Sequence, residues 1–376
     1  MNKIEMISFS ILLDEVAEVR QLLENLVSFD KVVYPELSIG IIPFTSSLGD
    51  GILKFLPNDV HSDFPQIGDQ EFQKIISSVR VGYKLYSDKK LSKANKLTIN
   101  IEKLFYSQIV ENYHLLQKLV INIFGQQDLG VYYFNGIPYA NTNQYHIYLE
   151  SIFSKTNKKK IPYFDKRSIG FLIEYSKALG TLINSVNQKT INKPIIQDVK
   201  IENFEQRDYF ILNRKKRNFL TGNLPLETQL FLFNILCQNN FVIHIIPDVL
   251  KSKNYFFTRS LIQCYLVSIT ALRLILDKNS SIISDSQMEQ IIFTINRKEK
   301  VFNLGQNFRN NIFHYKISNV PLQTFTNPNK FFEELIEFYS SKEINEYQNL
   351  LLLEVSKIND LINSLINENQ DSFQKI

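Results

Sequence analysis

The stretch "TRSLIQCYLVSITALRLILDKN", residues 258 to 279, is a long and nearly all-apolar helical pattern. A helix that is hydrophobic on almost every side is expected at the centre of a core. Arg273 interrupts its most apolar part, so no uncharged run approaches the ~20 residues that a membrane span needs. We therefore expect residues 258 to 279 to be the central helix of a globular domain.

Helical patterns flank this stretch on both sides. Pro225 opens a helix over residues 226–240, and Ser284 and Asp285 are expected to cap a helix that follows. The last pattern, residues 343–369, carries one broad apolar stripe that could also serve a dimer or a partner. This stripe consists of Ile344, Tyr347, Leu351, Val355, Ile358, Ile362 and Leu365. Residues 206–376 are thus expected to form an all-α helical bundle of roughly five helices.

The first part of the chain, residues 1–205, is expected to be an α+β domain of unassigned fold. Residues 14–29 form an amphipathic helical pattern, and "IEMISFSILL" before them fits a strand or a helix start. The segments "VVYPELSIGIIPF" and "SSVRVGYKLYS" are strand-like, and "LGDG" at residues 48–51 is typical of a turn. A long helix is expected to end at Gly125, and Asn135-Gly136 between aromatic flanks indicates a β-hairpin.

Composition sets limits on the class of protein. Of 376 residues, 44% are hydrophobic and 21% charged, which is typical of a globular chain long enough for two domains. The net charge of +4 comes from 42 basic and 38 acidic residues and does not by itself favour nucleic acid. Cys237 and Cys264 lie in apolar helical patterns, as expected of buried thiols in a reducing compartment. The start of the chain has no convincing export signal, so we expect a cytoplasmic protein that does not associate with a membrane.

One short stretch has the residue types of an acid–base site. In "NLGQNFRNNIFHYKI", residues 303 to 317, Arg309 stands five positions before His314, one of only five histidines. Histidine exchanges protons near neutral pH, and arginine offers a planar fork of donors that matches a phosphate. On a regular helix Arg309 and His314 lie about 140° apart, whereas Asn310 shares a line with His314. The opposite face, with Phe308, Ile312 and Tyr315, is expected to face the core.

This stretch resembles the Arg-x4–6-His motif of HEPN-superfamily ribonucleases, with Arg309, Asn310 and His314 at the matching positions. In that family the motif lies at the start of a late helix of a helical bundle, and this sequence has it at the same place. The resemblance covers roughly residues 205–370 and implies a metal-independent endoribonuclease without cofactors, in which Arg309 and His314 are catalytic and Asn310 orients the histidine or the phosphate. It also implies a homodimer in which two motifs meet, and a role as a toxin, an abortive-infection protein or an antiviral effector.

Two alternatives remain for this motif. In the first, Asn307 caps the helix, Arg309 is exposed and His314 is half-buried in a purely structural role. In the second, the bundle is a non-enzymatic module that dimerises or binds a nucleotide or a partner. The other histidines are weaker candidates. His61, near two aspartates, matches no standard metal site, and packing is expected for His114, His146 and His244.

Two basic runs lie near the expected domain boundary, at residues 156–162 and 213–219. In the second run Arg214, Lys215, Lys216 and Arg217 could neutralise RNA phosphates, although a solvated linker is the alternative. Together these features predict an endoribonuclease that cleaves RNA by attack of its 2′-hydroxyl. The α+β half is expected to sense a trigger, to bind a regulatory partner or ligand, to restrain the nuclease, or to position RNA.

Overall fold

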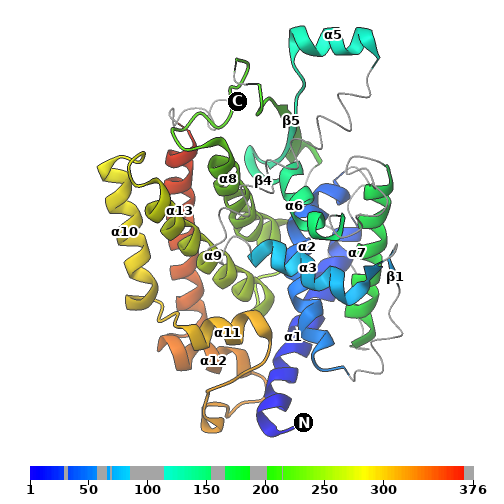
Figure 1. The fold of residues 1–376 in the computed structure, drawn as a ribbon. Helices are drawn as coiled ribbons and strands as arrows, with labels where there is room; N and C mark the ends of the chain where they lie inside the picture. The colour runs from blue at the N-terminus through cyan, green and yellow to red at the C-terminus, as the bar shows by residue number, and fades with distance from the viewer. Residues whose placement is uncertain are drawn as a thin grey trace.

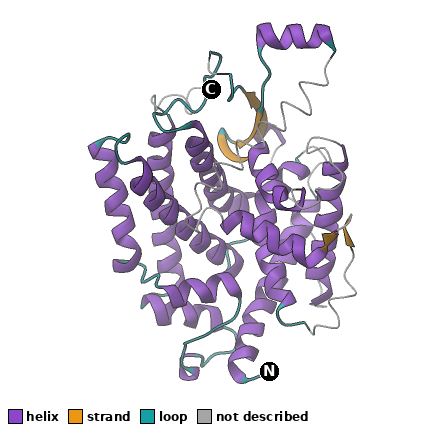
Figure 2. Ribbon diagram, in the orientation of Figure 1, coloured by secondary structure: helices purple, strands orange, loops and turns teal. Residues whose placement is uncertain are grey.

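The computed structural model describes most of the chain, namely residues 1–28, 33–56, 66–67, 70–84, 114–153, 166–186, 201–213 and 215–367. Helices dominate the described residues, with a three-stranded sheet and a separate pair of two-residue strands (Figure 1, Figure 2). The arrangement fits a mixed first half and a helical second half.

The first half is more helical than its sequence pattern predicts. Its helices are α1 (Lys3–Val27), α2 (Tyr34–Leu53), α3 (Phe72–Lys84), α5 (Leu115–Phe124), α6 (Thr142–Phe153) and α7 (Lys166–Val186). The α1 helix begins at a capping box, because the Asn2 side chain accepts the Glu5 N–H and the Glu5 carboxylate accepts the Asn2 N–H. "IEMISFSILL" is therefore the start of a helix.

Two strand predictions are wrong, and both segments are helices, α2 and α3. The α2 segment is apolar on nearly every side because it is packed between other helices, and this burial removes the helical period from its sequence. The predicted turn at residues 48–51 is also wrong, since these residues lie inside α2. Gly51 serves close packing there: a Cβ at this position would lie 2.8 Å from the ring of Tyr315.

The sheet contains the predicted hairpin. Strands β3 (Leu129–Phe134) and β4 (Ile137–Asn141) pair antiparallel around Asn135 and Gly136, whose φ angles are 50° and 77°. Strand β5 (Phe204–Tyr209) pairs antiparallel with the other edge of β3, giving the order β4-β3-β5. A two-residue pair, β1 (Gln66–Ile67) with β2 (Gln70–Glu71), precedes α3. The predicted long helix ends at Gly125, whose φ is 82°, but it does not run through His114, whose backbone is extended, so α5 begins at Leu115.

The second half contains the predicted helices. They are α8 (Leu226–Asn240), α9 (Tyr255–Asn279), α10 (Asp285–Lys300), α11 (Gln306–His314), α12 (Phe331–Ser340) and α13 (Ile344–Ile366). Pro225 precedes α8, and Ser284 caps α10 by accepting the Gln287 N–H. A π-helix, Phe241–Val249, continues α8 and was not predicted.

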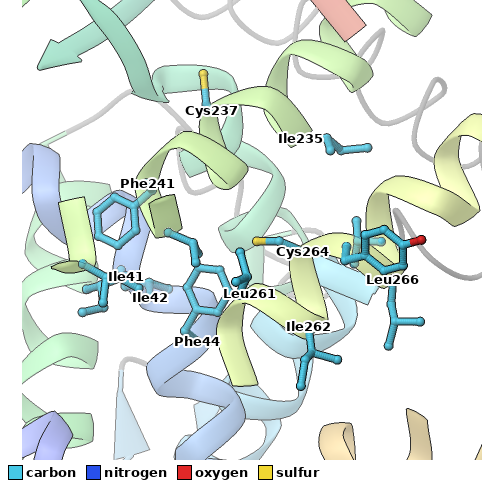
Figure 3. Close-up of a cluster of buried hydrophobic side chains, with 14 of the residues drawn as sticks. Ile41, Ile42, Phe44, Ile235, Cys237, Phe241, Leu261, Ile262, Cys264 and Leu266 are labelled. Carbon is cyan, nitrogen blue, oxygen red and sulfur yellow. The ribbon is translucent and has the colours of Figure 1, made fainter. Parts of the chain in front are cut away.

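The two halves pack against each other. Figure 3 shows Ile41, Ile42 and Phe44 of α2 in one cluster with Phe241 and with Leu261 of α9, and the thiols of Cys237 and Cys264 are buried. The β5 strand crosses the predicted boundary near residue 205 by pairing with β3. The boundary between residues 1–205 and 206–376 stays a prediction.

Two helical segments within the described residues have the length and hydropathy of a membrane span, Leu226–Val249 and Tyr255–Asn279. Both are mostly buried inside the molecule, as core helices of soluble proteins are. The predicted central position of the second segment is confirmed, because α9 contacts α1, α8, α10, α11 and α13.

Candidate active site

The motif lies on α11, which begins earlier than predicted. Gly305 is the N-cap residue, with an extended backbone, and its carbonyl accepts the Arg309 N–H at 3.0 Å. The expectation that Asn307 caps the helix is therefore wrong, because Asn307 already lies in the first turn. Asn307 instead accepts a hydrogen bond from the Asn319 side chain at 3.4 Å.

The predicted core face of α11 is confirmed. Phe308 and Ile312 are fully buried, and Tyr315 is 4% exposed. The Phe308 ring stacks on Tyr339 with 4.8 Å between centroids. This packing fixes the rotation of α11, so Arg309, Asn310 and His314, which are each half-buried, lie outside the core face.

The C-terminal end of α11 is anchored by a buried ion pair from α1 and α9. Arg259 Nη1 donates to the Ile312 carbonyl at 2.7 Å, and Arg259 Nε donates to Glu15 at 2.6 Å. The Tyr315 hydroxyl donates to the other Glu15 oxygen at 2.9 Å. Burial raises the pKa of the Glu15 carboxyl, while the Arg259 charge and the hydrogen bonds from Arg259 and Tyr315 oppose that rise. These contacts hold the last turn of α11 in place.

A second asparagine stabilises the turn after His314. Asn311 is 1% exposed, donates to the Ser318 carbonyl at 3.2 Å, and accepts the Ser318 N–H at 2.9 Å. Tyr315 has a left-handed backbone with φ 52°, which ends the helix directly after His314. His314 is thus the last helical residue, and its side chain is presented at a rigid helix end.

His314 lies in a charged cluster with residues of α2 and α3. We name Asp50, Lys54, Arg80 and His314 the Asp50 cluster. The Asp50 carboxylate is 2.7 Å from Lys54 Nζ and 3.1 Å from Arg80 Nη1. Arg80 Nη1 lies 3.4 Å from His314 Nδ1, and Lys54 Nζ donates to the His314 carbonyl at 3.3 Å.

The contact with Arg80 selects one form of the imidazole. A guanidinium nitrogen can only donate, so His314 Nδ1 is the acceptor in this contact. The neutral ring then carries its proton on Nε2, the nitrogen opposite Arg80. Proton exchange with a substrate would therefore take place through Nε2 unless Arg80 moves away.

Arg309 is directed along its own helix. Its guanidinium carbon lies 5.7 Å from the centroid of the Phe313 ring, one turn further on. Arg80, from the first half of the chain, lies beside the His314 ring. Asn310 lies one turn before His314, as the helical spacing predicts.

The basic run at residues 213–219 lies away from α11. Lys216 Nζ donates to the Ile123 carbonyl at 2.6 Å, at the end of α5, and Arg217 Nε donates to the Ile211 carbonyl at 2.7 Å. Lys215 is exposed, and Arg214 lies outside the described residues. In Figure 1 α5 and α11 lie at opposite ends of the molecule, so the structure does not bring this run to the motif.

The remaining histidines occupy other places. Burial lowers the pKa of His146 to about 3 and also lowers the pKa of His244, which agrees with packing roles. The packing role expected for His114 is wrong, because His114 is exposed just before α5. His61 lies outside the described residues. Within the described ranges, no group of three or more His, Cys, Asp or Glu side chains could hold a metal ion.

Three members of the Asp50 cluster, Asp50, Lys54 and Arg80, were not predicted as site residues from the sequence. Asp50 and Lys54 have the i, i+4 spacing of a helical ion pair, which would have been visible had this segment been identified as helical. Arg80 is 234 residues from His314 and carries no local signal. No model of a known protein family matches the chain, and neither a curated protein nor a solved structure is significantly similar to it.

Proposed function

We propose that this protein is a metal-independent endoribonuclease of the HEPN type. The observation that carries the proposal is the position of His314: a half-buried imidazole at a rigid helix end, on the same helix as Arg309 and beside a second guanidinium. Such a site combines a proton-exchanging group with permanent positive charge. Both are required to cleave RNA through its own 2′-hydroxyl.

The proposed reaction needs no cofactor. A base removes the proton of a 2′-hydroxyl, and the 2′-oxygen attacks the adjacent phosphorus while the bond to the 5′-oxygen breaks. The leaving oxygen takes a proton, so the products are a 2′,3′-cyclic phosphate and a 5′-hydroxyl. In this proposal His314 transfers protons, Arg309 stabilises the charge on the phosphate, and Asn310 orients the imidazole or the phosphate.

A homodimer in which two α11 helices meet would supply a second histidine, so that one imidazole acts as base and the other as acid. We further propose a role as a toxin, abortive-infection or antiviral effector in the cytoplasm. The first half would sense a trigger or bind a regulatory partner. The contacts of α2 and α3 with His314 support this last proposal, because any movement of these helices would reach the site directly.

The test is cleavage of purified RNA in the presence of EDTA. The wild-type protein should cut, whereas His314→Ala and Arg309→Ala should each be slower by about 100-fold or more, since acid–base and charge-stabilising groups contribute factors of this order. His114→Ala and Arg273→Ala are matched controls, because both side chains are exposed and lie outside α11. Equal cleavage by His314→Ala with an intact fold would exclude the proposal.

A second candidate function is a non-enzymatic module that dimerises or binds a nucleotide or a partner. The α13 stripe gives it little support, because the stripe is almost wholly buried within the chain. A groove of about 860 Å³ between α10 and α13 favours it more, with Phe293, 62% exposed, on its wall. If this function is correct, Phe293→Ser should abolish self-association in sedimentation experiments while RNA remains uncut by the wild-type protein.

A further inference from the structure

We propose that Arg80 is a substrate-binding residue of the same site, contacting a phosphate of the RNA backbone from the first half of the chain. This inference rests on the proposed function, which assigns charge stabilisation to Arg309 alone. Arg80 extends from α3 to within 3.4 Å of His314 Nδ1. A phosphate held by Arg80 would therefore lie within reach of the imidazole.

The charge of the Asp50 cluster favours an anion. One carboxylate, Asp50, faces two basic side chains, Lys54 at 2.7 Å and Arg80 at 3.1 Å. The described part of the cluster thus has one positive charge in excess, in a partly enclosed site where the Arg80 and Asp50 side chains are only 15% and 16% exposed. Electrostatic attraction is stronger in such a site than in open solvent.

The donors of Arg80 are not all used. Its Nη1 faces both Asp50 and His314, while its buried Nε has no hydrogen-bond partner among the residues that the structure describes. A buried donor without a partner is costly, and a phosphate accepts two parallel hydrogen bonds from a guanidinium. If the guanidinium turns from its buried position towards a phosphate, a phosphate oxygen can accept from Nε, whereas a lysine at this position has no such planar pair of donors.

Phosphate binding also frees the imidazole. While Arg80 donates to His314 Nδ1, this nitrogen cannot take up a proton. If a phosphate attracts the guanidinium, Nδ1 is released and His314 can become an imidazolium that donates a proton. Arg80 would thus couple substrate binding to the protonation of His314.

The test measures binding separately from cleavage. The full-length protein is titrated into a fluorescein-labelled, single-stranded 2′-O-methyl oligonucleotide of about 12 residues, which cannot be cut by 2′-hydroxyl attack. Arg80→Ala should weaken binding at least tenfold and reduce the slope of log affinity against log salt by about 0.7, as expected for one lost phosphate contact on a single strand. The affinity of Arg80→Lys for the oligonucleotide should lie between those of Arg80→Ala and the wild type.

Arg297→Ala is the matched control. Arg297 is also a half-buried arginine paired with a carboxylate, Glu354 at 2.9 Å, but it lies on α10 away from the cluster. The Arg297→Ala variant should bind the oligonucleotide with the affinity of the wild type. Thermal unfolding of each variant shows whether its fold is retained, and Arg80→Lys, which keeps the positive charge beside Asp50, replaces Arg80→Ala if the latter does not fold.

The outcomes distinguish this inference from the proposed function. Weakened binding by the Arg80 variants, with an inert wild-type enzyme, would support the phosphate site and count against the nuclease. Normal binding and an unchanged KM for both Arg80 variants, with active wild-type enzyme, would overturn the inference and leave the nuclease standing. Failure of the wild-type protein to bind the oligonucleotide would also overturn it.

Discussion

At the scale of single residues, carboxylates from α1 connect the two halves of the chain. Glu18 accepts the backbone N–H groups of Tyr255 and Phe256 at 3.2 and 2.9 Å, at the start of α9. This carboxylate takes the place of a side-chain cap, because the N-cap residue Asn254 makes no such bond. Burial nevertheless raises the pKa of Glu18 to about 8, and the charge of Glu15 adds to the rise.

The raised pKa makes a prediction about stability and pH. A carboxyl whose pKa is higher in the folded protein than in the unfolded chain stabilises the fold when it is protonated. For Glu18 this contribution is complete below pH 4.5, its ordinary pKa, and is lost as the pH rises through about 8. The unfolding free energy should therefore fall with pH in this window, with a contribution from Glu18 of at most about 1.4 kcal/mol per pH unit. Glu18→Gln should flatten the fall.

Urea unfolding at several pH values between about 5 and 8 measures this slope. Glu24→Gln on the same helix serves as the control for the change of a glutamate to a glutamine. An identical slope for Glu18→Gln and the wild type would show that Glu18 does not titrate in this range.

Residue patterns predicted the orientation of α11 but not the partners of its histidine. Phe308, Ile312 and Tyr315 lie at helical spacing, so their burial could be predicted from the sequence. The neighbours of His314 come from α2 and α3, more than two hundred residues away. Such contacts depend on the tertiary fold, and no local pattern records them.

At the scale of elements, caps and amphipathic stripes located the helices of the second half. Pro225, Ser284 and the α13 stripe all marked helices that the structure contains. The α2 and α3 helices were missed because β-branched and aromatic residues favour strands locally, whereas packing against other helices decides the outcome. Because α2 is buried on nearly every side, its apolar residues show no helical period that could be detected in the sequence.

The buried ion pair between Arg259 and Glu15, which anchors the end of α11, predicts an effect on stability. Arg259→Ala removes the hydrogen bond to the Ile312 carbonyl and leaves the Glu15 carboxylate, which is fully buried, without its cation. The unfolding free energy should fall by about 3–5 kcal/mol, as for other broken buried pairs. Denaturant unfolding measures the loss, and Lys342→Ala, which breaks an exposed pair with Glu346, should cost about 1 kcal/mol or less.

A double variant completes this experiment. Adding Glu15→Gln to Arg259→Ala should recover part of the loss, because the uncompensated buried charge is removed. If Arg259→Ala and Lys342→Ala lower the unfolding free energy by the same amount, the anchoring role of Arg259 is contradicted.

At the scale of the whole molecule, the candidate site is assembled from both halves of the chain. His314 and Arg309 come from the second half, whereas Asp50, Lys54 and Arg80 come from the first. The mixed first half and helical second half could be predicted from the sequence. The packing of α2 and α3 against α11 could not, because it depends on contacts between residues far apart in the chain.

The proposed chemistry determines the ends of the cut RNA. Attack by the 2′-hydroxyl must leave a 2′,3′-cyclic phosphate and a 5′-hydroxyl, and a 2′-O-methyl group at the cleaved position must block the reaction. Hydrolysis that uses a metal-activated water would instead tolerate that group and stop in EDTA.

The most direct measurement is therefore the end chemistry of RNA incubated with the purified protein in EDTA, wild type beside His314→Ala. We predict 2′,3′-cyclic phosphate ends from the wild type and none from His314→Ala. Ends of another kind, cleavage that requires a metal, or the same cyclic phosphate ends from His314→Ala would contradict the proposal.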